Sequence, residues 1–283
     1  MLDKREAALR RSIRRSLWSE LTKRFPRREL PRIAGMFDIW TGDRVPELAE
    51  HQGFKGLFVP DLPTKPWLDL ELFPFVADLR ASLPVLQREL DALLRAGTEF
   101  PSYGQRHTAR LAENGTPFEL PVPGWRDFTF REHSTRLHAN CRRCPETAKL
   151  VQRISKQVGT LAHCGFLILL PGSRLDEHVD EVNHQVAVHM GVLVPRRSGV
   201  RVAGKTRMHG VGKVLAFDNS FSHSAWNNGD SMRIIFGVYS SHPGLTSTEV
   251  AALQFLRPVL AELSRRSPES AQRTVPVGRR SAV

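Results

Sequence analysis

The chain of 283 residues is poor in cysteine and has no long apolar segment. Its three cysteines cannot all pair with one another, which argues against a disulfide framework and fits a reducing compartment. The longest apolar runs, at 165–171 and 211–217, fall far short of the roughly 20 residues that a membrane-spanning helix needs. No apolar core of a secretory signal precedes Pro26. We therefore expect a cytoplasmic protein without a transmembrane segment.

The chain also lacks the compositional bias of a disordered protein. Hydrophobic residues make up 41% and charged residues 25% of it, which is ordinary for a globular protein. Its length corresponds to one large domain or two small ones.

The middle of the chain has almost no net charge, although the whole chain has a net charge of +12. Residues 1–33 carry eleven basic against four acidic residues, and residues 264–283 carry five against one. A nucleic-acid enzyme more often spreads positive charge over its body and working groove. We therefore expect no nucleic-acid partner.

The two basic ends predict different structures. Five apolar residues recur at every fourth position and predict a basic amphipathic helix within residues 1–33, namely Leu9, Ile13, Leu17, Leu21 and Phe25. This helix either packs on the main domain with its arginines in solvent, or docks an acidic partner or, as a peripheral contact, an anionic membrane surface. Residues 264–283 predict a basic disordered tail.

Residues 34–263 predict a single domain whose first part is helical and whose later part is rich in sheet. Apolar spacing predicts helices over Phe73–Ala96, interrupted at Pro84, and over Pro145–Val158. Thr246 and Glu249 form a capping box that opens a last helix. Short apolar runs separated by turn residues predict five strands, at 166–170, 185–194, 198–203, 211–217 and 232–239.

Two histidines and an aspartate in the sheet-rich part suggest a metal site. His178 and Asp180 are two positions apart, so in a strand they would share one face. His223 follows a predicted strand, in a turn-like segment that could aim it back into a barrel. Two histidines and one carboxylate are the ligands of non-haem Fe(II) oxygenases. Arg233 opens the next apolar strand, and its guanidinium would suit the distal carboxylate of 2-oxoglutarate.

A second possible metal site is weaker. Cys141 and Cys144 form a lone CxxC, preceded by His133 and His138. Without a second cysteine pair this spacing is a poor indication of zinc.

The surroundings of these residues resemble the aspartyl/asparaginyl β-hydroxylase family. Order and spacing agree over about residues 54–250, in segments that begin at Leu57, Gly124, Leu170, Val188, Gly212, Ser224, Arg233 and His242. The resemblance implies a mainly β fold with flanking helices around a double-stranded β-helix, which is a jelly-roll, cupin-like core. It also implies an Fe(II) site and the cosubstrates 2-oxoglutarate and dioxygen.

The resemblance assigns roles residue by residue. His178 and His223 match the iron-binding histidines, and Arg233 matches the 2-oxoglutarate arginine. His189 matches a second histidine near the cosubstrate, and Trp125 an aromatic residue lining the same pocket. Each of the last two could instead be a core residue.

Three positions depart from the family pattern. Asp180 stands where the vertebrate enzymes have glycine, and would complete a triad of ligands unless it is a surface carboxylate. Ala187 replaces a frequent arginine, and Leu167 replaces the serine of the vertebrate proteins, which leaves open whether they alter 2-oxoglutarate binding.

Three functions follow from these observations. The first is a 2-oxoglutarate-dependent Fe(II) hydroxylase acting on the β-carbon of an aspartyl- or asparaginyl-type unit, free, in a peptide, or on an acidic carrier protein or leader. The second keeps this chemistry but hydroxylates a lipid acyl chain, as lipid A hydroxylases do. The third is a binding module without catalysis.

Overall fold

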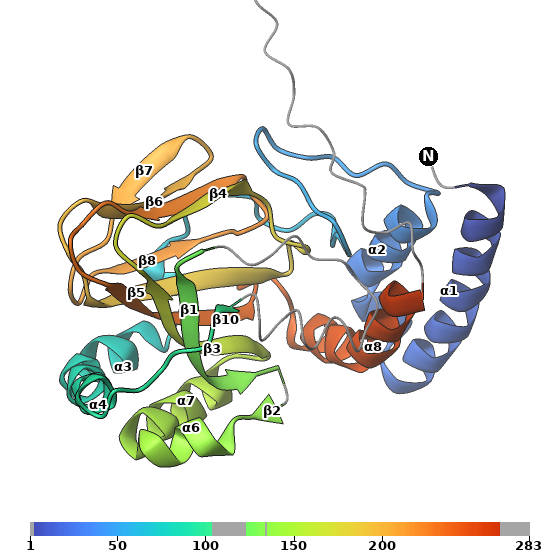
Figure 1. The fold of residues 1–283 in the computed structure, drawn as a ribbon. Coiled ribbons are helices and arrows are strands. Elements are labelled where there is room, and N and C mark those ends of the chain that lie inside the picture. Colours follow the sequence, from blue (N-terminus) through green and yellow to red (C-terminus); the bar gives the residue numbers. More distant parts are fainter. Residues whose placement is uncertain (1–2, 104–122, 134, 267–283) are drawn as a thin grey trace, which may run out of the picture.

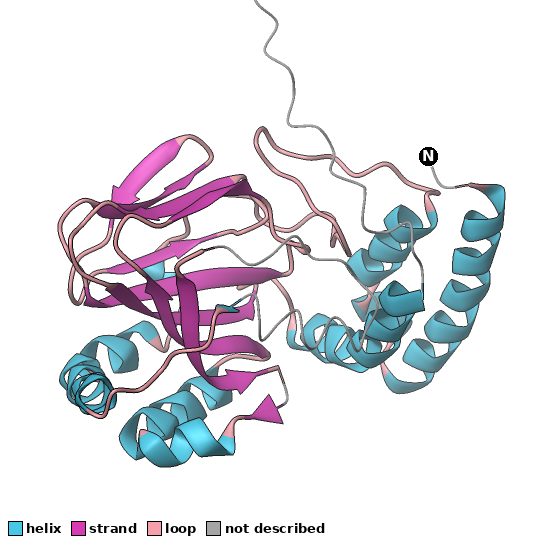
Figure 2. Ribbon diagram, in the orientation of Figure 1, coloured by secondary structure: helices cyan, strands magenta, loops and turns pink. Residues whose placement is uncertain are grey.

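The strands form two antiparallel sheets that face each other (Figures 1 and 2). In this computed structural model, residues 3–103, 123–133 and 135–266 are described. The large sheet has the order β2 (Thr135–Arg136), β1 (Trp125–Glu132), β3 (Leu161–Leu169), β10 (Arg233–Ser241), β5 (Gln185–Leu193) and β8 (Val214–Phe217). The small sheet has the order β4 (Arg174–His178), β9 (His223–Asn227), β6 (Ser198–Val202) and β7 (Lys205–Met208).

This strand order is a jelly roll. From β3 to β10 the chain passes repeatedly between the sheets, and β3, β10, β5 and β8 form one wall while β4, β9, β6 and β7 form the other. The predicted double-stranded β-helix core is therefore confirmed, together with the flanking helices.

The large sheet buries both of its faces, which explains why its strands are apolar almost throughout. Its outer face packs Phe166, Ile168 and Phe236 against helices that lie below the barrel in Figure 1. Its inner face packs Ala187 and Phe217 against the small sheet. The lower helices are α3 (Val76–Ala81), α4 (Leu83–Arg95), α6 (His138–Arg143) and α7 (Pro145–Gln157).

The interruption predicted at Pro84 lies between α3 and α4. Pro84 occupies the first turn of α4, where a helix tolerates proline because the backbone N–H there has no intrahelical acceptor.

Three helices form a second apolar cluster beside the barrel, on the right in Figure 1. They are α1 (Lys4–Arg24), α2 (Pro31–Thr41) and α8 (Ser247–Arg266). Two short 3-10 turns, Arg27–Glu29 and Leu70–Leu72, complete the helical elements. Leu17 and Leu21 of α1 are buried in this cluster, whereas Leu9 is 54% exposed. The second half of the predicted apolar stripe thus packs on the rest of the protein.

The boundary expected after residue 33 falls inside α2. This helix was not predicted, because its apolar residues surround Gly35 and lack a polar N-cap. It begins with Pro31 and ends at Gly42, whose φ of 80° closes the helix in the left-handed conformation.

The predicted capping box opens α8. The backbone N–H of Glu249 donates to Thr246 Oγ1 at 3.2 Å, and that of Thr246 donates to Glu249 Oε2 at 2.9 Å. Arg32 of α2 pairs with the same carboxylate, which ties α2 to α8. Residues 264–266 form the end of α8, and the remainder of the predicted tail lies outside the described residues.

One other detail differs from expectation. β8 begins at Val214 and not at residue 211, because residues 210–213 turn against β5, with Gly212 at a φ of 72°.

No helix in the described part of the chain is long and apolar enough to cross a membrane.

Candidate metal centre

His178 and His223 face each other across the small sheet. They are direct partners in the antiparallel pair of β4 and β9, and their ring centroids are 4.2 Å apart. His178 ends β4 and His223 begins β9, so the pair lies at one end of both strands. The turn-like segment expected before His223 is present at residues 218–222.

Asp180 joins the histidines by a route that differs from the predicted one. The strand ends at His178, so a shared strand face does not bring the two side chains together. Instead, the N–H of Asp180 donates to the carbonyl of Asn219 at 2.9 Å, which holds the loop after β4 against the turn before β9. Asp180 Oδ1 then lies 3.7 Å from His178 Nε2 and 3.9 Å from His223 Nε2.

Hydrogen bonds orient all three side chains. His178 Nδ1 lies 2.7 Å from the carbonyl of Asp176, and His223 Nδ1 lies 2.8 Å from the carbonyl of Phe221. A carbonyl only accepts, so each Nδ1 carries the proton and each Nε2 keeps its lone pair for a ligand. Asn219 Nδ2 donates to Asp180 Oδ2, which leaves Oδ1 facing the histidines.

The turn at residues 218–222 is itself fixed from several sides. Asp218 Oδ1 accepts from the N–H and the hydroxyl of Ser220, at 2.9 and 2.7 Å. The carbonyl of Ser220 accepts from Gly53, and the N–H of Ser222 donates to His51. The N-terminal part of the chain therefore helps to position His223.

Burial shifts the pKa values of His223 and of its neighbour Asp218. Burial, helped by the neighbouring His178, lowers the pKa of His223 to about 4 against the opposing effect of Asp180. Burial also raises the pKa of Asp218 to about 6, against its hydrogen bonds from Ser220. An imidazole that is neutral at pH 7 is the form that binds a metal ion.

The cluster is open on one side. The side chains of His178 and Asp180 are 34% and 35% exposed, whereas that of His223 is 10% exposed. The potential ligand atoms all lie within 4.8 Å of one another, and they form the one such group of three among the described residues. Two imidazoles and one carboxylate fit a divalent ion with open positions, of which non-haem Fe(II) is typical.

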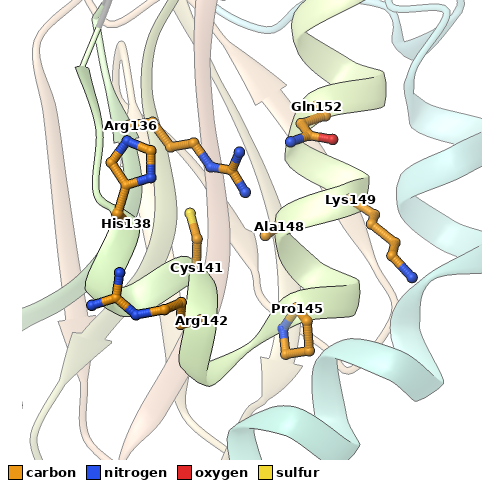
Figure 3. A pocket seen from close by; sticks show the side chains of 8 residues that line it. All are labelled: Arg136, His138, Cys141, Arg142, Pro145, Ala148, Lys149 and Gln152. Atoms are coloured by element: carbon orange, nitrogen blue, oxygen red, sulfur yellow. The ribbon is translucent and has the colours of Figure 1, made fainter.

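The cysteines do not form a comparable site in the described part of the chain. Cys141 and Cys144 are buried free thiols, and burial raises the pKa of Cys144 to about 12. Figure 3 shows Cys141 in a hollow lined by Arg136 and Arg142, whose positive charges disfavour a cation. A thiol with so high a pKa is a poor metal ligand.

Arg233 lies on the inner side of the large sheet without an ion-pair partner among the described residues. It is 2% exposed, and its Nε is buried without a hydrogen bond. Burial lowers its pKa to about 10, so it is still charged at pH 7. A buried, unpaired guanidinium is costly, and a bound carboxylate would compensate it.

Arg233 and the histidine cluster belong to the same interior. Tyr239 lies on the same face of β10, and its pKa is raised by burial and by the charge of Asp180 and lowered by that of Arg233. Its hydroxyl lies 3.4 Å from His189 Nε2.

The other two expected pocket residues also face this interior. His189 contacts Phe217 at a ring distance of 5.0 Å, and Phe217 contacts His223 at 5.7 Å. Trp125 is half-buried and stacks on Tyr103 at 3.6 Å. It lies in register with Leu169, which is in turn opposite Arg233.

The two departures from the family pattern line the same face without polar groups. Ala187 lies opposite Tyr239 and Leu167 opposite Ile235, and both are buried.

The sequence did not point to Asn219, the hydrogen-bond partner of Asp180. The run Asp218–Ser222 after a strand was the available signal, since Asp, Asn and Ser favour a tight turn.

These features define a jelly-roll protein with a candidate metal site of two histidines and a carboxylate. A comparison with protein families assigns it further. The model described as "Aspartyl/Asparaginyl beta-hydroxylase" matches residues 80–243, more than half of the chain, and the chain belongs to that family.

Individual relatives agree with this assignment. The chain is 29% identical over 205 residues to "Aspartate beta-hydroxylase domain-containing protein 2" of Rattus norvegicus, covering 70% of this chain and 57% of the relative. It is 30% identical over 213 residues to "Aspartate beta-hydroxylase domain-containing protein 1" of Mus musculus, covering 71% and 54%. The chain thus spans little more than half the length of these relatives.

Solved structures show only a distant likeness. A Cupin 2 conserved barrel domain protein from Salinispora arenicola is 14% identical, with a TM-score of 0.29, 48% of this chain and 94% of that chain covered. The salicylate 1,2-dioxygenase from Pseudaminobacter salicylatoxidans is 15% identical, also with a TM-score of 0.29, covering 53% and 34%. The strand order, not these scores, carries the fold assignment.

Proposed function

We propose that this protein is an Fe(II)- and 2-oxoglutarate-dependent dioxygenase that hydroxylates an unactivated C–H bond and releases succinate and carbon dioxide. The observation that carries the proposal is the convergence of two histidine Nε2 atoms and one carboxylate oxygen. The other polar atom of each side chain is held by a hydrogen bond: both Nδ1 atoms donate to backbone carbonyls, and Asp180 Oδ2 accepts from Asn219. Hydrogen bonds that fix the orientation of metal-binding side chains in this way are typical of metal sites in proteins.

Different residues would bind the metal, bind 2-oxoglutarate and exclude water. His178, Asp180 and His223 would hold Fe(II), which when bound supplies the activation of dioxygen at the expense of 2-oxoglutarate. Arg233 would bind the distal carboxylate of 2-oxoglutarate inside the barrel, with His189 and Trp125 beside it. The apolar residues Leu167 and Phe217 exclude water from this chamber, which protects a reactive site from side reactions.

For the substrate we propose the β-carbon of an aspartyl- or asparaginyl-type unit, free, peptidyl or on a carrier. Membership of the aspartyl/asparaginyl β-hydroxylase family supports this class. "Aspartyl/asparaginyl beta-hydroxylase" of Mus musculus is 31% identical over 131 residues, although these cover only 18% of that protein. Hydroxylation of a lipid acyl chain is the alternative outcome of the test.

The test measures turnover and product in one experiment. Protein purified without metal is loaded with Fe(II) and incubated in air with 2-oxoglutarate and pools of amino acids, peptides or lipids. We expect succinate to form and one component of a pool to gain the mass of one oxygen. The pool that gains oxygen decides between the amino-acid and the acyl-chain substrate.

A ligand variant provides the control. His178→Ala with His223→Ala should abolish both metal binding and succinate formation, because a single carboxylate remains. Met208→Ala, an exposed change on β7, should leave both unchanged. If the wild type neither bound Fe(II) nor formed succinate, the protein would be a binding module and the proposal would be wrong.

A further inference from the structure

A third histidine, His209, lies beside His189 and within reach of the charge of Arg233. It follows β7 and is 9% exposed, and neither of its ring nitrogens has a hydrogen-bond partner in the described structure. Its ring centroid is 6.1 Å from that of His189, at an angle of 30°. Nothing in the sequence motifs pointed to this residue.

The backbone around His209 is built to place this ring inside. The N–H of His209 donates to the carbonyl of Ser198 at 3.1 Å. The next residue, Gly210, comes so close to β5 that a Cβ at Gly191 would lie 2.1 Å from the Gly210 carbonyl oxygen. The neighbours Met208 and Val211 are 41% and 53% exposed, so His209 is the buried side chain of this stretch.

Several buried polar atoms of His209 and its neighbours lack hydrogen-bond partners. Arg233 Nε, His189 Nδ1 and both nitrogens of His209 are all in this state. A buried polar atom without a partner destabilises the fold, so several together indicate a place that a ligand or ordered water fills. Because Arg233 supplies a positive charge with no carboxylate paired to it in the described chain, that ligand is an anion.

The neighbouring side chains on the large sheet offer few further polar contacts to such an anion. Ala187 and Leu167 have no polar side-chain atoms, and Tyr239 is already within 3.4 Å of His189. Burial and the positive charge of Arg233 lower the pKa of His209, so its ring is neutral and donates from one nitrogen. Both nitrogens are unbonded, so either tautomer is available to a ligand.

We infer that His209 is a positioning residue that donates a hydrogen bond to the distal carboxylate of 2-oxoglutarate beside Arg233. This inference rests on the proposed function and extends it by one residue. His209 supplies, from the loop after β7, the polar contact that Ala187 and Leu167 do not offer from β5 and β3. It is not one of the three residues that would hold the metal.

Direct binding tests the inference without catalysis. The probe is 2-oxoglutarate, titrated calorimetrically into protein loaded with Zn(II), and the comparison ligand is 2-oxopentanoate. The two acids have the same chain length, and only 2-oxoglutarate has the second carboxylate. The ratio of their affinities therefore reports contacts to that carboxylate alone.

His209→Leu should weaken 2-oxoglutarate binding about tenfold to a hundredfold, the effect of losing one hydrogen bond to a charged group. Binding of 2-oxopentanoate should change by less than a factor of three. His209→Gln, which keeps a donor, should recover part of the lost preference. Met208→Ala, on the adjacent exposed position, should bind both acids as the wild type does.

The outcomes separate the inference from the function it rests on. A wild type that binds no 2-oxoglutarate refutes the proposed function. A wild type that binds it, with His209→Leu keeping the full preference or losing affinity for both acids equally, refutes the role of His209 alone.

A measurement on the unsubstituted protein covers the case in which His209→Leu does not fold. In protein labelled with ¹⁵N-histidine, 2-oxoglutarate should shift the ring nitrogen signals of His209, identified by their loss in His209→Gln, and 2-oxopentanoate should not. Signals of His209 unmoved by 2-oxoglutarate would overturn the assignment.

Discussion

The amide of Asn219 offers a sharp test of the candidate metal centre, because it holds one ligand without being a ligand itself. Asn219 Nδ2 donates to Asp180 Oδ2, and this bond keeps Oδ1 between the two imidazoles. In Asn219→Ala the carboxylate loses that bond. The backbone bond from Asp180 to the residue 219 carbonyl is retained, so the loop should stay in place.

The size of the effect follows from what the side chain does. Loss of a group that orients a metal ligand typically weakens metal binding about 10- to 100-fold, which is roughly 1.4 to 2.7 kcal/mol. Removing Asp180 itself, as in Asp180→Ala, should weaken binding further, because one of three ligands is then missing. Titration with Mn(II), followed by its electron paramagnetic resonance signal, measures all variants on one scale.

Gln52→Ala is the matched control for Asn219→Ala. Gln52 Nε2 donates to Ser220 Oγ at 3.1 Å, in the same turn but without contact to a ligand. We expect its metal affinity to stay within about a factor of three of the wild type. If Asn219→Ala also bound Mn(II) as the wild type does, or if Gln52→Ala weakened binding equally, the orienting role of Asn219 would be refuted.

Three further predictions concern binding and stability. Arg233→Ala should lower 2-oxoglutarate affinity more than a hundredfold, since removing one partner of a buried charge pair costs about 3–5 kcal/mol; calorimetry showing a change of only a few fold would contradict this. Leu21→Ala should lower the free energy of unfolding in urea by about 2–5 kcal/mol, because Leu21 is fully buried, whereas Leu9→Ala, at a 54% exposed position, should change it by less than about 0.5 kcal/mol. Burial disfavours the charged form of Glu249, but hydrogen bonds and charge from Arg32 outweigh this and hold its pKa below the ordinary value. The contribution of Glu249 to the free energy of unfolding is therefore present above the unfolded pKa of about 4.3 and is lost as the pH falls through the folded pKa. Glu249→Gln should remove that part of the acid-induced loss of stability. An unchanged dependence of stability on pH would contradict this prediction.

The jelly roll was predictable because several of its strands are short apolar runs and the segments between them consist of typical turn residues. The runs at 185–194, 198–203 and 232–239 reappear, with shifted ends, as β5, β6 and β10. Strands whose residues are mostly polar gave no such signal. β4 (Arg174–His178) and β7 (Lys205–Met208) are examples, because they cover one wall of the barrel with only one face buried or none.

The proximity of His178, Asp180 and His223 was predictable, but the reason given for it was not the one the fold uses. Spacing suggested that His178 and Asp180 share a strand face, whereas the strand ends first and a long-range hydrogen bond to residue 219 brings Asp180 back. Such a bond depends on the pairing of β4 with β9, which is 45 residues away along the chain. His209 escaped prediction for a similar reason, since its burial accompanies contacts with β5 and β6 that its local sequence does not reveal.

The basic N-terminal helix has less free charge than its sequence suggests. Arg10 pairs with Glu6 at 2.7 Å, Arg11 with Asp43 at 2.7 Å, and Arg14 with Asp38 at 2.5 Å. Exposed pairs of this kind are worth little in stability, but they neutralise the charge that a docking partner would meet.

Docking of an acidic carrier remains a proposal, and the structure narrows where it could occur. Arg15, Arg27 and Arg28 have no ion-pair partner in the described structure, and all three are exposed or half-buried. They lie at α1 and the turn after it, beside helices whose apolar sides are already packed together. A carrier would therefore meet charge here and little apolar surface, so its binding should be weak and should decrease steeply with salt. Because Leu17 and Leu21 are buried in the same helix, removing α1 would expose part of the second cluster, and single charge changes such as Arg15→Glu are the cleaner way to separate docking from folding.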